Sequence, residues 1–268
     1  MQQTLLIENR TGLYSKHLNR KVDLTVLVPV KQNALKPMPL LLMNDGQDFG
    51  ALGLKNTVEV FLHENQMEPV LIVGIHANQN RLAEYGTACT PDYANRGSKA
   101  PNTTSFVIEE LVPYLNLNYN VHPTGITYCG FSLGGLMALD IAWNHPRLFS
   151  KVGVFSGSLW WRSKALDDGY KAEDRIMHQQ IASSIKRNNM QFWFQCGTQD
   201  ETDDRDNDGV IDSIQDTLDC IAELEQKGYG WGKEVFYKEV KEGRHNPDTW
   251  SKVMPEFLRW AYGATEEF

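Results

Sequence analysis

Short, uninterrupted apolar runs recur along this chain, and they restrict its possible folds more than any other feature of the sequence. They cover residues 39–43, 70–75, 126–129, 152–155, 191–196 and 234–240. A strand that is apolar on both faces needs cover on both sides, which is the situation in a parallel sheet flanked by helices. Residues 22–28 instead alternate apolar and polar side chains, which predicts a partly exposed strand.

Segments of helical character separate these strand candidates. They cover residues 57–66, 103–117, 133–145, 171–187 and 213–227, and a last helix runs from Pro247 or Asp248 to about Tyr262. Strands alternating with helices predict an α/β fold with a mostly parallel central sheet and helices on both faces. Because the sequence shows no repeat and no linker-like break, residues 1–268 are predicted to form one domain. The polar segment 76–101 is expected to be a long loop, and such loops are usually functional or mobile.

Charge and composition exclude several classes of partner. The 26 Lys and Arg against 34 Asp and Glu give a net charge of −8, which repels the phosphate backbone of a nucleic acid. No apolar stretch approaches the roughly 20 residues needed to span a bilayer, so no membrane partner is expected. Four widely spaced cysteines are too few for a disulfide framework, and the N-terminus lacks the pattern of a secretion signal. We therefore expect a cytoplasmic protein, and nothing in the sequence indicates its oligomeric state.

The segment Gly130-Phe131-Ser132-Leu133-Gly134 matches the G-x-S-x-G pattern. It directly follows one predicted strand and opens a predicted helix, which is the setting of the nucleophile elbow. Small residues are needed where the backbone crowds itself at the strained serine, and the helix N-terminus adds positive potential near a developing oxyanion. Ser132 is thus the predicted nucleophile. The alternative is a glycine-rich turn in which the serine only caps the helix.

A catalytic serine needs a base and an acid, and both are expected at the edge of the sheet where the elbow lies. His245 lies in the loop 242–247 between the last strand and the last helix, so it should emerge at that edge. Asp200 follows the strand 191–196 and should emerge there too. The order serine, acid, histidine is that of the α/β-hydrolase triad. Glu201 and Asp203 are alternatives to Asp200 that spacing alone does not separate, and a surface-loop role is the alternative for His245.

The oxyanion hole of this fold combines the N–H after the nucleophile with one from the loop after an earlier strand. Those positions predict Leu133 and Gln47, the latter just beyond Gly46 after the apolar run 39–43. An ordinary Asp-Gly turn is the alternative for the second segment.

Five blocks in this order resemble a known family. They are Leu41–Gln47, Gly130–Gly135, Ser156–Trp161, Gly197–Asp200, and Gly243-Arg244-His245 followed by Trp250. Over residues 20–262 the chain resembles the Putative esterase family, which groups esterase D, enterobactin-type siderophore esterases, feruloyl esterases and mycolyl transferases. The resemblance implies an α/β-hydrolase fold with the triad Ser132, Asp200 and His245. One departure is Arg244, where a glycine often precedes the histidine in this group.

The resemblance also suggests that Arg81, Glu84 and Tyr85 line or brace the site. Trp160 follows a strand on the elbow side and is a candidate wall for an aryl or sugar group, although core packing explains tryptophans at least as often. Trp250, at helical spacing from other apolar residues, is expected in the core.

The acidic segment 204–212 follows the pattern of a calcium loop. Its predicted ligands, which supply the oxygen atoms that a hard cation prefers, are Asp204, Asp206, Asp208, Val210 and Asp212. Position twelve carries Gln215 instead of the usual glutamate, and a helix does not precede the loop. The alternative is a solvated acidic loop in which Asp212 caps the following helix. A bound calcium would be structural, because hydrolysis by the triad needs no cofactor.

Together these features predict a serine carboxylic-ester hydrolase that acts through an acyl-enzyme on a small-molecule ester. An acyltransferase with the same acyl-enzyme, or a non-catalytic binding protein on the same fold, are the alternatives. The acyl and alcohol parts of the substrate cannot be read from the sequence.

Overall fold

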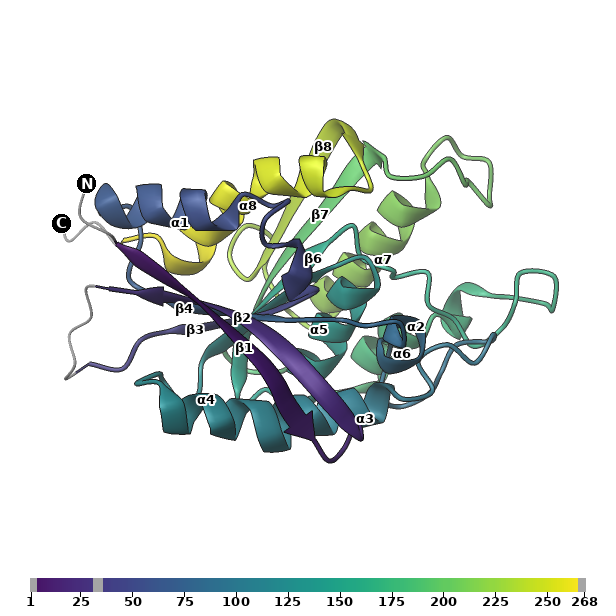
Figure 1. Ribbon diagram of the computed structural model, residues 1–268. Coiled ribbons are helices and arrows are strands. Elements are labelled where there is room, and N and C mark those ends of the chain that lie inside the picture. Colours follow the sequence, from purple (N-terminus) through teal and green to yellow (C-terminus); the bar gives the residue numbers. More distant parts are fainter. Residues whose placement is uncertain (1–3, 31–35, 265–268) are drawn as a thin grey trace.

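A computed structural model describes residues 4–30 and 36–264 of the chain. They contain one eight-stranded sheet in the order β1-β2-β4-β3-β5-β6-β7-β8 (Figure 1). The strand β2 pairs antiparallel with both β1 and β4, and every other neighbouring pair is parallel. The strands are β1 Leu5–Ser15, β2 Arg20–Pro29, β3 Leu40–Asn44, β4 Leu71–Ile75, β5 Ile126–Phe131, β6 Phe149–Phe155, β7 Gln191–Gln199 and β8 Val235–Arg244. The predicted α/β-hydrolase fold with a mostly parallel sheet is confirmed.

Helices pack on both faces of this sheet (Figure 1). They are α1 Leu54–His63, α2 Arg81–Glu84, α3 Ala100–Ser105, α4 Val112–Asn118, α5 Leu133–Asn144, α6 Ile176–Ser183, α7 Asp212–Gln226 and α8 Pro247–Tyr262. Short 3₁₀ turns cover Gly46–Asp48 and Ala172–Asp174, and a π-helical turn covers Phe106–Leu111. Among the described residues, no helix combines the length and the apolar character needed to cross a membrane.

Alternate residues of the apolar strands enter two separate cores, as expected for strands that are buried on both faces. In β3, Leu40 and Leu42 join the core under α3 to α7, whereas Leu41 and Met43 join the core under α1 and α8. The sheet therefore lies between two layers of helices, and the carboxyl ends of β3 and β5 to β8 lie at one edge of it.

Strand β1 was not predicted, because only its first three residues, Leu5 to Ile7, form an apolar run. It is an edge strand that alternates irregularly between buried and exposed positions, and its register with β2 shifts between Arg10 and Leu13. Gly12 adopts a φ of +75° within this irregularity. Pairing with β2, rather than a periodic pattern of its own, holds this segment in the sheet.

The helix expected over residues 103–117 begins earlier, at Ala100, and is not a uniform α-helix. A π-helical turn, Phe106–Leu111, separates α3 from α4. Pro113 lies in the first turn of α4, and a proline has no N–H to continue the α-helical hydrogen bonding. The break in the predicted helix thus has a local chemical cause.

The helix expected over residues 171–187 is interrupted at Arg175, whose backbone is extended (φ −73°, ψ 113°). Its guanidinium Nη1 lies 2.6 Å from Asp216 and 2.8 Å from Asp219, both on α7. Its backbone also forms an isolated antiparallel bridge with Arg162. These long-range contacts replace the continuous helix that local periodicity predicts.

The long polar segment 76–101 is not the simple loop that was expected, because it contains helical residues and contacts distant parts of the chain. It contains α2 and the start of α3, and the N–H of Ala88 donates to the buried carboxylate of Asp140 on α5 at 2.9 Å. Gly86 and Gly97 pack so closely on the Trp161 ring that a Cβ would lie 2.7 and 2.8 Å from it. The segment is therefore packed against the part of the chain that follows β6.

Candidate active site

Ser132 stands at a sharp turn between β5 and α5, with φ 53° and ψ −125°. A non-glycine residue in this region of conformational space is strained, and such strain is concentrated at functional sites. The Ser132 N–H donates to the carbonyl of Phe155 on β6 at 2.8 Å. Within the described chain its side chain makes no capping hydrogen bond to α5, so the helix-capping alternative is not what the structure shows.

The glycines of the elbow are required by close backbone contacts. A Cβ on Gly130 would lie 2.3 Å from the carbonyl oxygen of Gly134, and one on Gly134 would lie 2.7 Å from Asp45 Oδ2. Both distances are shorter than non-bonded atoms tolerate. The turn that presents Ser132 therefore depends on the small residues of the G-x-S-x-G pattern.

A cavity of about 260 Å³ lies at the carboxyl edge of the sheet, where Ser132, Asp200 and His245 meet. Asp200 directly follows β7, and His245 directly follows β8. The structure thus brings together three residues that are far apart in the sequence. The full lining comprises Ser132, Ser156, Gly157, Ser158, Trp160, Asp200, Glu201, Ser213 and His245.

The charges of Asp200 and His245 influence each other across this cavity. Burial raises the pKa of Asp200, against the lowering effects of the Gly197 N–H, the Ser156 hydroxyl and the charge of His245. Burial also lowers the pKa of His245, while the charge of Asp200 opposes this effect and that of Arg81 adds to it. His245 is therefore neutral, and able to accept a proton, near neutral pH.

The side chains of the three residues are not joined by hydrogen bonds in the described chain. Ser132 Oγ lies 3.4 Å from Ser158 Oγ, and Asp200 Oδ2 accepts from the Gly197 N–H at 2.9 Å. Asp200 Oδ1 is buried without a partner among the described residues, so one carboxylate oxygen is available for a further donor. Catalytic hydrogen bonds are often long without a substrate and tighten when one binds.

Glu201 lines the same cavity, but its electrostatic partners differ from those of Asp200. Burial raises its pKa, the backbone N–H and hydroxyl of Ser213 lower it, and Asp212 raises it. Glu201 therefore interacts with the beginning of α7, whereas Asp200 interacts with His245. Asp203, the other alternative, is exposed and is absent from the described lining.

Ser156 and Trp250 are two residues of the site whose role the sequence does not reveal. Ser156 is buried with φ 45°, and its Oγ accepts a 2.9 Å hydrogen bond from Trp250 Nε1. The Trp250 ring stacks on Phe131 at 4.8 Å and lies edge-on to His245 at 5.4 Å. Trp250 is buried, as expected for the core, and it also forms the support of the histidine loop. The Ser-Gly-Ser turn at the end of a strand is the one sequence signal that could have pointed here.

The predicted oxyanion segments lie against each other at the N-terminus of α5. Asn44 Nδ2 donates to the carbonyl of Gly134 at 2.8 Å, and Asp45 adopts φ 61° at the turn that follows. Leu133 is the first residue of α5, where backbone N–H groups have no partner within the helix. Gln47 Oε1 accepts from the Ala77 N–H at 3.0 Å, and Gln47 Nε2 lies 3.4 Å from Asp45 Oδ1, so its side chain is held between these two residues. Neither Leu133 nor Gln47 belongs to the cavity lining found in the described residues.

Comparison with known proteins identifies the family of this chain. The family described as Putative esterase matches residues 15–261, most of the chain. This chain belongs to that family. Uncharacterized protein YjcH of Bacillus subtilis is 26% identical over 250 residues, which cover 92% of this chain and 93% of that protein. The diacylglycerol acyltransferase/mycolyltransferase Ag85A of Mycobacterium leprae is 25% identical over 264 residues, covering 87% of this chain and 78% of that protein.

Solved structures of esterases share the fold. The enterobactin esterase FES of Shigella flexneri superimposes with a TM-score of 0.76 at 16% identity, over 97% of this chain. This chain corresponds to only 60% of that longer protein. A ferulic acid esterase superimposes with a TM-score of 0.71 at 18% identity, and the match covers 96% of this chain and 97% of that one.

The three residues suggested by resemblance to this family occupy different places. Arg81 binds Asp45 through two hydrogen bonds, from Nε at 2.7 Å and from Nη2 at 2.8 Å, and lies 5.0 Å above the Tyr85 ring. Arg81 thereby braces the turn that carries Asp45, the predicted oxyanion segment. Glu84 is buried and pairs with Arg20 of β2 at 2.6 Å, so it braces the α2 segment and does not line the cavity described above. Tyr85 is buried with its hydroxyl unpartnered among the described residues.

The acidic loop brings together part of its predicted ligand set. Carboxylate oxygens of Asp204, Asp206 and Asp208 lie within 4.8 Å of one another, a donor set that suits a hard cation. Asp212 is instead engaged by Arg205, whose backbone N–H donates to Oδ1 at 3.0 Å and whose Nη1 lies 3.2 Å from Oδ2. Val210 lies in the same loop, and its N–H donates to Asp208 Oδ1 at 2.8 Å. The capping role expected of Asp212 is wrong, because Asp212 is the first residue of α7 and Ile211 precedes it; the solvated acidic loop itself stays an alternative to a calcium site.

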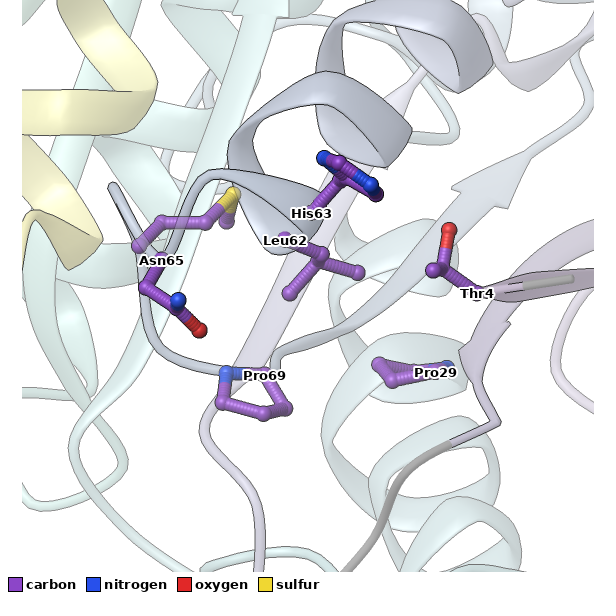
Figure 2. A pocket seen from close by; sticks show the side chains of 7 residues that line it. Thr4, Pro29, Leu62, His63, Asn65 and Pro69 are labelled. Atoms are coloured by element: carbon purple, nitrogen blue, oxygen red, sulfur yellow. The ribbon is translucent and has the colours of Figure 1, made fainter. Parts of the chain in front are cut away.

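A second cavity, of about 360 Å³, lies away from this site, where α1 ends and before β4 begins (Figure 2). Its described lining combines apolar side chains with His63, Asn65 and Thr4, and it holds no carboxylate. A histidine without an acid or an activated nucleophile cannot perform the chemistry expected of the elbow. The lining consists of Thr4, Pro29, Leu62, His63, Asn65, Met67 and Pro69.

Proposed function

We propose that this chain is a serine carboxylic-ester hydrolase that acts on small-molecule esters through an acyl-enzyme. One observation carries the proposal: the strained Ser132 shares a cavity with Asp200 and His245, whose charges influence each other. Membership of the Putative esterase family supports the reaction class.

In the first half-reaction Ser132 Oγ attacks the ester carbonyl while His245 accepts the hydroxyl proton. The resulting oxyanion accepts hydrogen bonds from the N–H groups of Leu133 and Gln47, and the positive end of α5 favours its charge. The tetrahedral intermediate then collapses, the bond to the alcohol breaks, and His245 returns the proton to that leaving alcohol. In the second half-reaction water attacks the acyl-serine with His245 again as base, and the carboxylic acid leaves.

Asp200 is the proposed acid that orients His245 and stabilises its protonated form. Its free Oδ1 and its electrostatic coupling to His245 support this role over Glu201, which interacts with Ser213. In the absence of substrate the raised pKa of Asp200 reflects its burial, and a protonated His245 beside it favours the ionised carboxylate.

The chain's own residues supply every proton transfer in this mechanism, so the proposal includes no catalytic cofactor. Calcium in the acidic loop would be held by Asp204, Asp206 and Asp208, and it would fix the loop between β7 and α7. That position makes its proposed role structural.

Acyl transfer to an alcohol is the second candidate. The similarity to Ag85A, a diacylglycerol acyltransferase/mycolyltransferase, favours it, because an acceptor alcohol can replace water in the second half-reaction. The two functions share the acyl-enzyme and differ in the product formed when both acceptors are present.

Hydrolysis of p-nitrophenyl acetate, butyrate and octanoate and of a feruloyl ester by wild type and Ser132→Ala tests the proposal. We expect wild type to hydrolyse at least one ester and the variant to lose a factor on the order of 10⁴–10⁶ in kcat. A transesterified product that predominates when glycerol or a sugar is added would favour the acyltransferase. Equal, background-level rates for both proteins on every ester would favour the non-catalytic binding protein.

A further inference from the structure

Trp160, which lines the cavity with Ser132 and His245, belongs to a cluster of arginine and aromatic side chains. We call this group the arginine–aromatic cluster. It combines the 76–101 segment, the turn after β6 and the segment before α6, and its members are Tyr93, Arg96, Trp160, Arg162 and Tyr170. Because one member is a wall of the cavity, the cluster extends the site in one direction.

Arg162 is at the centre of this cluster. Its guanidinium carbon lies 5.0 Å from the ring centroid of Tyr93, 5.6 Å from that of Tyr170 and 5.9 Å from that of Trp160. A guanidinium carries five N–H donors in a planar fork, and a flat anion can accept two of them. Nη1 uses one donor on the Trp160 carbonyl at 3.3 Å. Nε is buried and has no acceptor among the described residues.

The charge of Arg162 is also uncompensated, unlike that of the neighbouring arginines. Arg96 Nε binds Asp92 at 2.6 Å, and Arg175 and Arg205 both pair with the buried Asp216. Within residues 4–30 and 36–264, no carboxylate forms an ion pair with Arg162. Arg162 is thus a cation without an ion-pair partner among the described residues, next to Trp160 of the cavity wall. It provides a site for a negatively charged ligand group.

We propose that Arg162 binds an anionic group of the substrate, so that the preferred esters carry a carboxylate in addition to the scissile bond. The rings of Trp160 and Tyr93 would flank the part of the substrate between them. This inference rests on the proposed function, because it assigns the substrate class of the same cavity. The alternative is a purely structural role, in which Arg162 holds the 76–101 segment in place. The Tyr93 N–H in that segment already donates to the backbone carbonyl of Arg162 at 3.0 Å. That backbone bond survives replacement of the side chain, so the two roles can be separated.

Two matched ester pairs test the proposal on both sides of the scissile bond. On the acyl side, 4-nitrophenyl hemisuccinate is compared with 4-nitrophenyl methyl succinate. On the alcohol side, 4-carboxyphenyl acetate is compared with 4-carbamoylphenyl acetate. For at least one pair, wild type should prefer the anionic ester, as measured by the ratio of its kcat/KM to that of the neutral ester. In Arg162→Gln this ratio should fall about tenfold or more, mainly because KM for the anionic ester rises. Arg162→Lys should keep only part of the ratio, since it retains the charge without the planar fork.

Arg187→Gln is the matched control. Arg187 also stacks on a tryptophan, Trp143, at 5.2 Å and donates to that residue's carbonyl at 3.1 Å, but it lies before β7, at the opposite end of that strand from Asp200. Its replacement should leave both ratios unchanged. A wild-type ratio near one for both pairs, or equal ratios in wild type and Arg162→Gln, would overturn the inference while leaving the proposed hydrolase intact.

Binding measurements test the inference independently of the proposed function. Calorimetry with Ser132→Ala should show tighter binding of the anionic ester than of its neutral partner, and this difference should disappear in Ser132→Ala/Arg162→Gln. If no ester is turned over, the proposed function fails and this binding difference alone decides the inference. Equal binding of the anionic and neutral esters would overturn it.

Discussion

Trp250 Nε1 donates a 2.9 Å hydrogen bond to Ser156 Oγ, and the same indole ring lies edge-on to His245 at 5.4 Å. The Ser156 hydroxyl in turn lowers the pKa of Asp200. One tryptophan on α8 therefore connects the histidine loop to the turn beside the carboxylate. Because of this connection, we expect Trp250 and Ser156 to matter for catalysis.

Removing one partner of this hydrogen bond should impair both stability and turnover. Ser156→Ala leaves the buried Trp250 Nε1 without an acceptor, at a cost of about 1–3 kcal/mol in the free energy of unfolding. Because the Ser156 hydroxyl lowers the pKa of Asp200, its loss should also reduce kcat, by about tenfold. Once Trp250→Phe has removed the donor, Ser156→Ala should destabilise the protein less. Urea unfolding of both single variants and the double variant measures this coupling, and additive free energies would contradict it.

If Asp200 is the triad acid, replacing Asp200 and replacing the adjacent Glu201 should have different effects on activity. Asp200→Asn should lower kcat by about 10³–10⁴, because His245 loses the group that orients it and stabilises its charge. Glu201→Gln should retain most of the activity, since Glu201 interacts with Ser213 at the beginning of α7. Steady-state kinetics of the two variants on one ester decides the assignment. The reverse order of effects would make Glu201 the acid.

The pH profile should reflect the surroundings of His245. Its neutral form is the base, so kcat/KM should rise with pH and level off above its pKa, which burial lowers from 6.5. Arg81 lowers this pKa further, so Arg81→Met should move the acidic limb to higher pH. In Arg81→Met/Asp45→Asn the ion pair is removed as a unit, and the limb should move less. An unchanged or lowered midpoint in Arg81→Met would be inconsistent with this account.

The calcium prediction concerns stability and not chemistry. Millimolar Ca²⁺ should raise Tm by several degrees if it binds the folded loop, and Mg²⁺ should do so less, because it requires a stricter octahedral geometry. Asp204→Asn/Asp206→Asn/Asp208→Asn should abolish the shift. Differential scanning calorimetry with calcium and with chelator makes the comparison. Equal Tm values in both conditions would leave the segment as a solvated acidic loop.

The sequence predicts the fold and the placement of the central site residues because both follow from simple rules. Apolar runs alternating with helices require a covered parallel sheet, and the carboxyl ends of its strands meet at one edge. Ser132, Asp200 and His245 each follow a different strand, so their meeting in one cavity is a consequence of topology. Their catalytic roles are still a prediction until activity is measured.

Features that depend on contacts between distant segments could not be predicted in this way. The extended backbone at Arg175 follows its pairing with α7, which no local pattern reveals. The Ser156–Trp250 bond and the stacking around Arg162 join segments far apart in the chain. Strand β1 was missed for a related reason, because an exposed edge strand has little apolar periodicity of its own.

The central claim is that Ser132 is an activated nucleophile, and covalent labelling tests it most directly. Wild type, Ser132→Ala and His245→Ala are incubated with a fluorophosphonate, which reacts with activated serines, and intact mass and peptide mapping locate the adduct. We predict one adduct per chain on Ser132, none in Ser132→Ala, and much slower labelling in His245→Ala. Failure of wild type to react, or an adduct on Ser156 or Ser158 instead, would contradict the proposed active site.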